Sequence, residues 1–154
     1  MFMKVLIVYD TFYGNTQKVA EMVKDALAGH EVNLIKIDVL TQEKIDETEM
    51  IVFGTPTRAF NMTKKVRRAL KKYKYQDKLF WAFDTRANVE DLDNKFLLKM
   101  INRFGYAAEK IEKMLLKKGA VKKLESSWYF VKDSEGPLYE DVQEKIKTDL
   151  NEIL

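Results

Sequence analysis

The chain has 154 residues, 46% of them hydrophobic and 33% charged, with a net charge of +3, and this composition suits one folded domain over residues 1–154. It contains no cysteine and a single histidine, which argues against disulfides, iron–sulfur clusters, a metal site and a serine–histidine catalytic pair. No apolar run approaches membrane-spanning length and no signal peptide opens the sequence, so a cytoplasmic location is the default expectation.

The most informative stretch lies near the N-terminus. Residues 5–9 are apolar and rich in β-branched side chains, which predicts a buried strand. Apolar residues then recur with helical spacing from Asn15 to Ala28, and Gly29 ends that pattern. Because the first N–H groups of a helix lack internal partners, a polar turn between such elements can hold a phosphate. A plain helix cap by Asn15 or Thr16 is the alternative.

The remaining elements follow from similar patterns. His30, just beyond the first helix, is expected at the surface. The proline of Thr55–Pro56 lacks an N–H group, so the strand before it should end at Gly54. The strands that we expect cover 31–37 at a sheet edge, 50–53, 78–83, and 120–131 with a break at 125–127. The helices that we expect are a short one over 41–47, one from Asn61 or Thr63 to about Tyr73, one from Asp91 or Asp93 to Phe104, and one over 106–118. A last helix should have Pro137 at its first position.

The charge is unevenly distributed along the chain. Nine basic residues and one acid lie between Arg58 and Lys78, and the predicted helix in this segment has lysine and arginine on its outer faces. A solvated helix face is the ordinary explanation of such a run. An acidic protein partner is the main alternative, and nucleic acid is not expected because no reading motif accompanies the charge.

The segment from Asp10 to Ala20 resembles the phosphate loop of the flavodoxin-like proteins, with Thr11, Gly14 and Thr16 in the matching places. Tyr13 replaces a small hydroxyl residue that many flavodoxins carry, and in this it is similar to the flavodoxin modules of flavodiiron proteins and to related quinone reductases. A second match, Gly54–Arg58, resembles the family's next flavin-contacting loop. The resemblance implies FMN as cofactor.

The alternation of strands and helices predicts an α/β fold, and with the resemblance a flavodoxin-like three-layer sandwich: a five-stranded parallel sheet of order 2-1-3-4-5 with helices on both faces. The loops after strands one, three and four then meet at one crevice. The candidate cofactor-binding residues in these loops are Thr11, Phe12, Tyr13, Gly14, Asn15, Thr16, Thr55, Pro56, Thr57, Arg58, Phe60, Asp84, Thr85 and Arg86. Helix-core packing competes with flavin contact for Phe60.

The expected function is electron transfer by an FMN flavoprotein that cycles between oxidised, semiquinone and hydroquinone states, with no catalytic residue of its own. Two alternatives stay open: an FMN-dependent NAD(P)H:quinone-type reductase, and a flavin-free interaction module on the same fold. The expected partners are redox proteins with an acidic docking surface near the basic helix over 64–74.

Overall fold

The computed structural model describes residues 1–88 and 94–154, and a parallel sheet forms its centre. The sheet order is β2-β1-β3-β4-β5, with β6 also paired to β4, and every pairing is parallel. This confirms the predicted order and the interrupted fifth strand, whose two parts are β5 and β6. The strands are β1 (Lys4–Tyr9), β2 (Glu31–Lys36), β3 (Met50–Pro56), β4 (Leu79–Ala87), β5 (Val121–Lys122) and β6 (Ser127–Val131).

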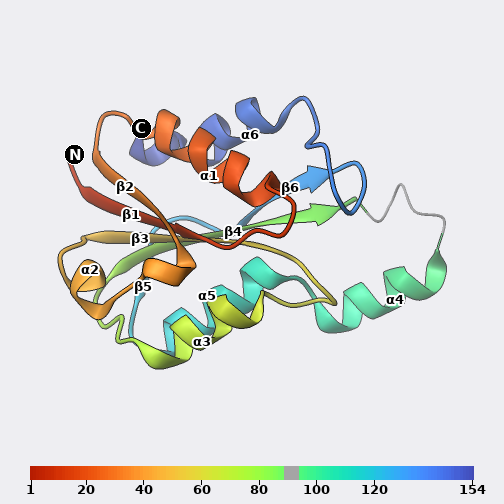
Figure 1. The fold of residues 1–154 in the computed structure, drawn as a ribbon, viewed down its shortest axis with the longest axis horizontal. Helices are drawn as coiled ribbons and strands as arrows, with labels where there is room; N and C mark the ends of the chain where they lie inside the picture. The colour runs from red at the N-terminus through yellow and green to blue at the C-terminus, as the bar shows by residue number, and fades with distance from the viewer. Residues whose placement is uncertain (89–93) are drawn as a thin grey trace.

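Helices cover both faces of the sheet, as predicted. Helices α1 and α6 lie over one face, and α3 and α5 lie over the other (Figure 1). The helices are α1 (Asn15–Ala26), α2 (Gln42–Asp46), α3 (Lys64–Lys72), α4 (Lys95–Phe104), α5 (Ala107–Lys117) and α6 (Val142–Asp149), with 3-10 turns η1 (Ile37–Val39) and η3 (Asn151–Ile153). Among the described residues, no helix is long and apolar enough to cross a bilayer.

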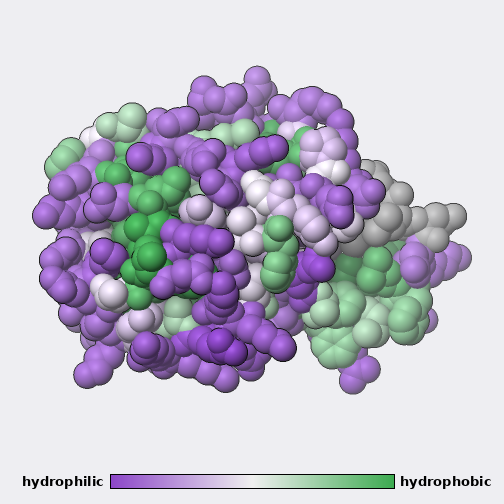
Figure 2. Space-filling view, in the orientation of Figure 1, coloured by the Kyte–Doolittle hydropathy of each residue, from purple (hydrophilic) through white to green (hydrophobic). Residues whose placement is uncertain are grey.

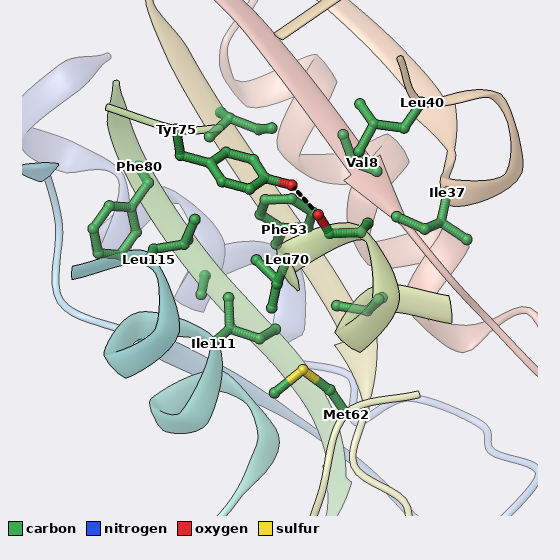
Figure 3. Close-up of a cluster of buried hydrophobic side chains, with 14 of the residues drawn as sticks. Val8, Ile37, Leu40, Phe53, Met62, Leu70, Tyr75, Phe80, Ile111 and Leu115 are labelled. Carbon is green, nitrogen blue, oxygen red and sulfur yellow. Dashed lines mark hydrogen bonds between the residues drawn. The ribbon is translucent and has the colours of Figure 1, made fainter. Parts of the chain in front are cut away.

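The core on the α3 and α5 side is built around aromatic rings and branched aliphatic side chains (Figure 3). Phe53 of the central strand β3 meets the edge of the Tyr75 ring, with 5.8 Å between the ring centroids. The Tyr75 hydroxyl donates to the Ala69 carbonyl of α3 at 2.8 Å, so its one polar group is satisfied inside the core. This contact fixes the end of α3 against the sheet.

The core on the α1 and α6 side ties the two ends of the chain together through His30. The ring is only 8% exposed, so the expected surface position is wrong. Its Nδ1 accepts a hydrogen bond from the Met3 N–H, and its Nε2 donates to the Ile153 carbonyl. The histidine is buried because both ring nitrogens find backbone partners there.

Two strands run further than the sequence suggested. Strand β3 continues through Gly54 to Pro56, and Pro56 is aligned with Thr85 at the last position of the ladder, where its missing N–H does not interrupt the pairing. Strand β4 continues to Ala87, so the segment 84–86 lies in the strand and not in a loop. At Gly54 a side chain is excluded, since an added Cβ would lie 2.3 Å from Cζ of Phe83.

The predicted helices are present with shifted starting points. Thr63 caps α3 by accepting a hydrogen bond from the Val66 N–H, whereas Asn61 lies in the preceding turn. Helix α4 is capped by Asn94; the predicted caps Asp91 and Asp93 lie outside the described residues. Pro137 does not start the last helix, because its carbonyl instead accepts a hydrogen bond from Lys132 in a turn ahead of α6.

Candidate functional site

A cavity of about 400 Å³ lies at the carboxyl ends of β1, β3 and β4, where loops from distant parts of the chain meet. This volume is in the range of small-molecule sites. The lining residues are Thr11, Phe12, Tyr13, Asn15, Thr16, Pro56, Thr57, Arg58, Ala59, Thr85, Arg86, Ala87, Val131 and Ser134.

One end of the cavity is formed by the start of α1, which no side chain caps. Gly14 precedes the helix with a φ of +91°, a left-handed conformation that glycine adopts without steric cost. Within the described part of the chain, the N–H groups of Asn15, Thr16 and Gln17 have no hydrogen-bond acceptor, and neither do those of Phe12 and Tyr13. The simple cap by Asn15 or Thr16 is therefore absent, and five backbone donors are left available to an anion.

Hydroxyl groups complete this end of the cavity. Thr11 Oγ1 accepts the Gly14 N–H at 2.9 Å, which leaves the Thr11 hydroxyl proton free to donate to another oxygen. The hydroxyls of Thr16 and Thr85 are 2.8 Å apart, and since one proton is enough for that bond, the second can also point to a ligand. The Asn15 side-chain amide is instead engaged with the Glu135 carbonyl at 3.0 Å.

The opposite wall is a tight turn with a cation beside two aromatic rings. Arg58 and Asn61 exchange backbone hydrogen bonds of 2.8 and 2.9 Å, and the two residues between them, Ala59 and Phe60, have φ values of +47° and +68°. Left-handed conformations are costly for residues with a Cβ, so this turn is strained. The Arg58 guanidinium lies 5.0 Å from the Phe12 ring centroid, across the mouth of the cavity.

A buried ion pair forms the floor on the β4 side. Arg86 makes two hydrogen bonds of 2.6 Å to the two carboxylate oxygens of Asp84, and Asp84 also accepts the Ala108 N–H at the start of α5. The guanidinium stacks on the Tyr106 ring, 3.5 Å from its centroid. The pKa of Tyr106 is raised, mainly by burial. Arg86 is thus held in a fixed position at the cavity, and the Asp84 carboxylate is shared between Arg86 and the start of α5.

The structure gathers most of the predicted site residues around one cavity. Ten of the fourteen candidates line the cavity: Thr11, Phe12, Tyr13, Asn15, Thr16, Pro56, Thr57, Arg58, Thr85 and Arg86. Gly14 shapes the loop without lining the cavity. Thr55, Phe60 and Asp84 lie outside it: Thr55 accepts the Thr63 N–H, Phe60 packs on Phe104 with 5.8 Å between ring centroids, and Asp84 is buried under Arg86.

Four lining residues were not among the sequence candidates. Ala59 and Ala87 directly follow predicted residues and could have been found by extending the loops by one position. Val131 and Ser134 come from the end of β6 and the turn after it. Nothing in their local sequence points to a ligand, because only the parallel pairing of β6 with β4 brings them to this edge.

Comparisons with known proteins agree with this fold. A flavodoxin domain profile matches residues 6–124. A flavodoxin from Clostridium saccharobutylicum is 27% identical over 106 residues, which are 65% of this chain and 66% of that protein. A flavodoxin from Aquifex aeolicus (strain VF5) is 38% identical over 68 residues, 42% of this chain and 37% of that protein. The matched segments thus span just under two thirds of the first relative's length and little over a third of the second's.

Solved structures with the same fold cover nearly the whole chain. Oxidised flavodoxin 2 from Bacillus cereus has a TM-score of 0.74 and 22% identity, over 94% of this chain and 93% of that one. A Fusobacterium nucleatum flavodoxin bound to flavin mononucleotide has a TM-score of 0.70 and 13% identity, over 98% and 96%. The flavodiiron core of Flv1 from Synechocystis sp. PCC6803 has a TM-score of 0.70 and 16% identity, over 98% of this chain and 35% of that one. Because the family profile covers most of the sequence, the chain belongs to the flavodoxin domain family.

Proposed function

We propose that this chain binds FMN in the cavity at the carboxyl ends of β1, β3 and β4 and carries electrons between partner proteins. The observation that carries the proposal is the uncapped start of α1, where five backbone N–H groups lack an acceptor among the described residues. A phosphate would satisfy several of them at once and would be favoured by the helix dipole. The family supports the same cofactor, and so does the flavodoxin neighbour that is bound to flavin mononucleotide.

The residues divide into two groups by the chemistry they offer. Thr11, Thr16 and Thr85, together with the backbone of residues 12–17, supply donors for the phosphate. Arg58, Thr57 and Arg86, with the aromatic rings of Phe12 and Tyr13, would hold the remainder of the cofactor. When bound, FMN supplies the ability to accept and release electrons, whereas the protein binds it, orients it and sets the charge around it.

An electron carrier is favoured over a reductase by the chemistry of the cavity wall. Among the described lining residues there is no aspartate, glutamate, histidine or lysine, and Tyr13 is the one side chain of a type used in general acid–base catalysis. Electron transfer between proteins requires no such group. The positive charges of Arg58 and Arg86 are the fixed charges that face the cavity.

The two activities are separated by a kinetic experiment. The protein reconstituted with FMN is mixed with NADPH or NADH and a soluble quinone, with and without a separate flavin reductase, and nucleotide oxidation and cytochrome c reduction are followed. The proposal predicts cytochrome c reduction that depends on the added reductase. Rapid nucleotide oxidation by the chain and quinone alone would instead establish a reductase.

The proposal includes the sign of the partner's charge. Helix α3 and the turn after it have seven basic residues and no acid between Lys64 and Lys74. Hydrophilic side chains gather over α3 along the lower edge of the molecule (Figure 2). A surface of this kind favours redox partners with an acidic docking surface, since opposite charges speed encounter and set orientation.

A further inference from the structure

A second cavity, of about 870 Å³, lies beside α3 and adjoins the cofactor cavity. Four residues line both cavities and so form a shared wall: Thr11, Phe12, Arg58 and Ala59. The rest of the second cavity is formed by Asp10, Lys36, Asn61, Met62, Thr63, Lys64, Lys65, Arg67 and Arg68. An occupant of this cavity would therefore be separated from the cofactor site by a single layer of side chains.

The wall of the second cavity is strongly cationic. Six of its residues are basic: Lys36, Arg58, Lys64, Lys65, Arg67 and Arg68. Within the described part of the chain, Lys65 alone among them has an ion-pair partner, Asp38, at 2.6 Å. The one acid in the wall, Asp10, is 5% exposed, and its Oδ1 accepts the Thr11 N–H at 2.9 Å. The wall thus carries six cations and one carboxylate, and Asp38 beyond it pairs with Lys65 and also attracts Lys36, so the cavity keeps an excess of positive charge.

A further cation, Lys110, lies next to the wall of this cavity. Lys110 of α5 donates to the Phe60 carbonyl in the strained turn. The pKa of Lys110 is lowered, mainly by burial and further by the charges of Arg67 and Lys113. Lys110 therefore adds a further positive charge close to Arg67, and an anionic occupant of the neighbouring cavity would be attracted by both.

The spread of the cations around the cavity favours a protein over a small anion. Lys64, Lys65, Arg67 and Arg68 lie along α3, which is roughly 13 Å long at 1.5 Å per residue, and Lys36 and Arg58 come from other parts of the chain. Phe12, 57% exposed, stands at the boundary of the two cavities. Arginine beside exposed aromatic rings is the composition of protein interfaces, and a partner seated here would lie next to the cofactor it exchanges electrons with.

We propose that the second cavity is the docking site for an acidic segment of a redox partner protein, whose carboxylates pair with the lysines and arginines of its wall. This inference rests on the proposed function for the identity of the partner as a redox protein. It specifies that the contact is made by carboxylates inside a cavity at the start of α3, and not by the general charge of the basic surface.

The test compares two variants with the same change of charge. Lys64 and Arg68 line the cavity, whereas Lys71 and Lys74 are exposed basic residues outside it. The Lys64→Glu/Arg68→Glu protein and the Lys71→Glu/Lys74→Glu protein are titrated into a short fluorescein-labelled peptide of alternating glutamate and alanine. Anisotropy is read at low and at physiological salt. We expect Kd to rise by at least about tenfold for the first variant and by less than about twofold for the control.

Several results would overturn the inference. Equal losses in the two variants would mean general surface attraction, and absence of peptide binding by the wild type at low salt would mean no site. Tighter binding of single-stranded DNA or of phosphatidylserine vesicles than of the peptide would assign the cavity to another class of partner. FMN retention is measured on every sample: a wild type that binds the peptide but never FMN refutes the proposed function and leaves the docking site standing.

Discussion

The hydroxyl oxygens of Thr16 and Thr85 lie 2.8 Å apart and join the start of α1 to the end of β4. Both residues are almost fully buried, at 1% and 4% exposure, yet both line the proposed FMN cavity. Their shared hydrogen bond positions two hydroxyls next to the unpaired N–H groups of α1. It also makes the proposed phosphate end of the cavity dependent on the first turn of α1 and the end of β4, which are 69 residues apart.

The Thr16→Val substitution tests the phosphate role of this pair. Valine keeps the shape and removes the donor, so FMN binding should weaken by roughly ten- to hundredfold, the value of one hydrogen bond to a charged group. Riboflavin, which lacks the phosphate, should bind within about twofold of its wild-type affinity. Thr48→Val is the matched control, because Thr48 is a buried threonine that bonds to the Lys44 carbonyl, away from the cavity. Equal losses for FMN and riboflavin would contradict the assignment.

Gly54→Ala should destabilise the protein through a clash in the sheet. The new Cβ would meet the Phe83 ring at 2.3 Å, and Phe83 is fully buried against Trp81 and Tyr129. Overpacking of this kind costs about 1–3 kcal/mol of unfolding free energy. Urea unfolding measures the loss, with Gly29→Ala as control, since nothing lies within 4 Å of a Cβ at Gly29. A Gly54→Ala protein as stable as the control would refute the close approach.

Ala59→Gly should stabilise the folded protein, contrary to the usual effect of glycine. Ala59 has a φ of +47°, and relief of a left-handed conformation is worth about 1–2 kcal/mol, partly offset by the greater freedom of glycine in the unfolded chain. The expected gain is about 0.5–1 kcal/mol in urea unfolding. The control is Ala28→Gly, an exposed alanine with negative φ, where a small loss is expected. A loss at both positions would show that the turn at 58–61 is not strained.

Stability should fall at alkaline pH through buried tyrosines. Burial raises the pKa of Tyr75 and of Tyr129, so both stay protonated in the folded state after they ionise in the unfolded chain, near pH 10. Their stabilising effect is complete below about pH 10 and is lost as the pH rises further, at up to about 1.4 kcal/mol per pH unit for each tyrosine.

The pH effect is isolated by substitution. Tyr75→Phe should cost about 1 kcal/mol at neutral pH, because the Ala69 carbonyl loses its donor, and should flatten the decline of unfolding free energy between about pH 10 and 11. Tyr13→Phe, at a ring that is 49% exposed, should do neither. A Tyr75→Phe profile parallel to that of the wild type would exclude this tyrosine as the cause.

The positions of the strands and helices could be predicted because the controlling signals are local, whereas the sheet order was predicted from the resemblance to the flavodoxin-like proteins. Apolar runs at Val5–Tyr9 and Met50–Phe53 identify the central strands, and Gly29, Gly105 and Gly119 stand at or just after the ends of predicted helices. The prediction for His30 was wrong because residues distant in the sequence decide whether its side chain is buried. His30 is buried because Met3 and Ile153 supply partners for its ring, and neither is recognisable as a partner from the sequence.

In the candidate site, too, local motifs could be recognised from the sequence, whereas contacts between distant segments could not. The motif from Thr11 to Thr16 lies within a few residues, so the sequence alone was enough to name these candidates together. Asp84 was a candidate from its place after the predicted strand, but β4 runs on to Ala87 and its carboxylate lies under Arg86, against the start of α5, outside the cavity lining. Val131 and Ser134 were missed because their place in the cavity depends on the pairing of β6 with β4.

Binding of the FMN phosphate by the uncapped start of α1, as proposed, is measured directly by a fluorescence titration of the flavin-free protein with FMN and, in parallel, with riboflavin. We expect tight binding of FMN and binding of riboflavin weaker by at least about hundredfold, the difference that two charge-assisted hydrogen bonds supply. Equal affinities for the two flavins, or no binding of either, would contradict it.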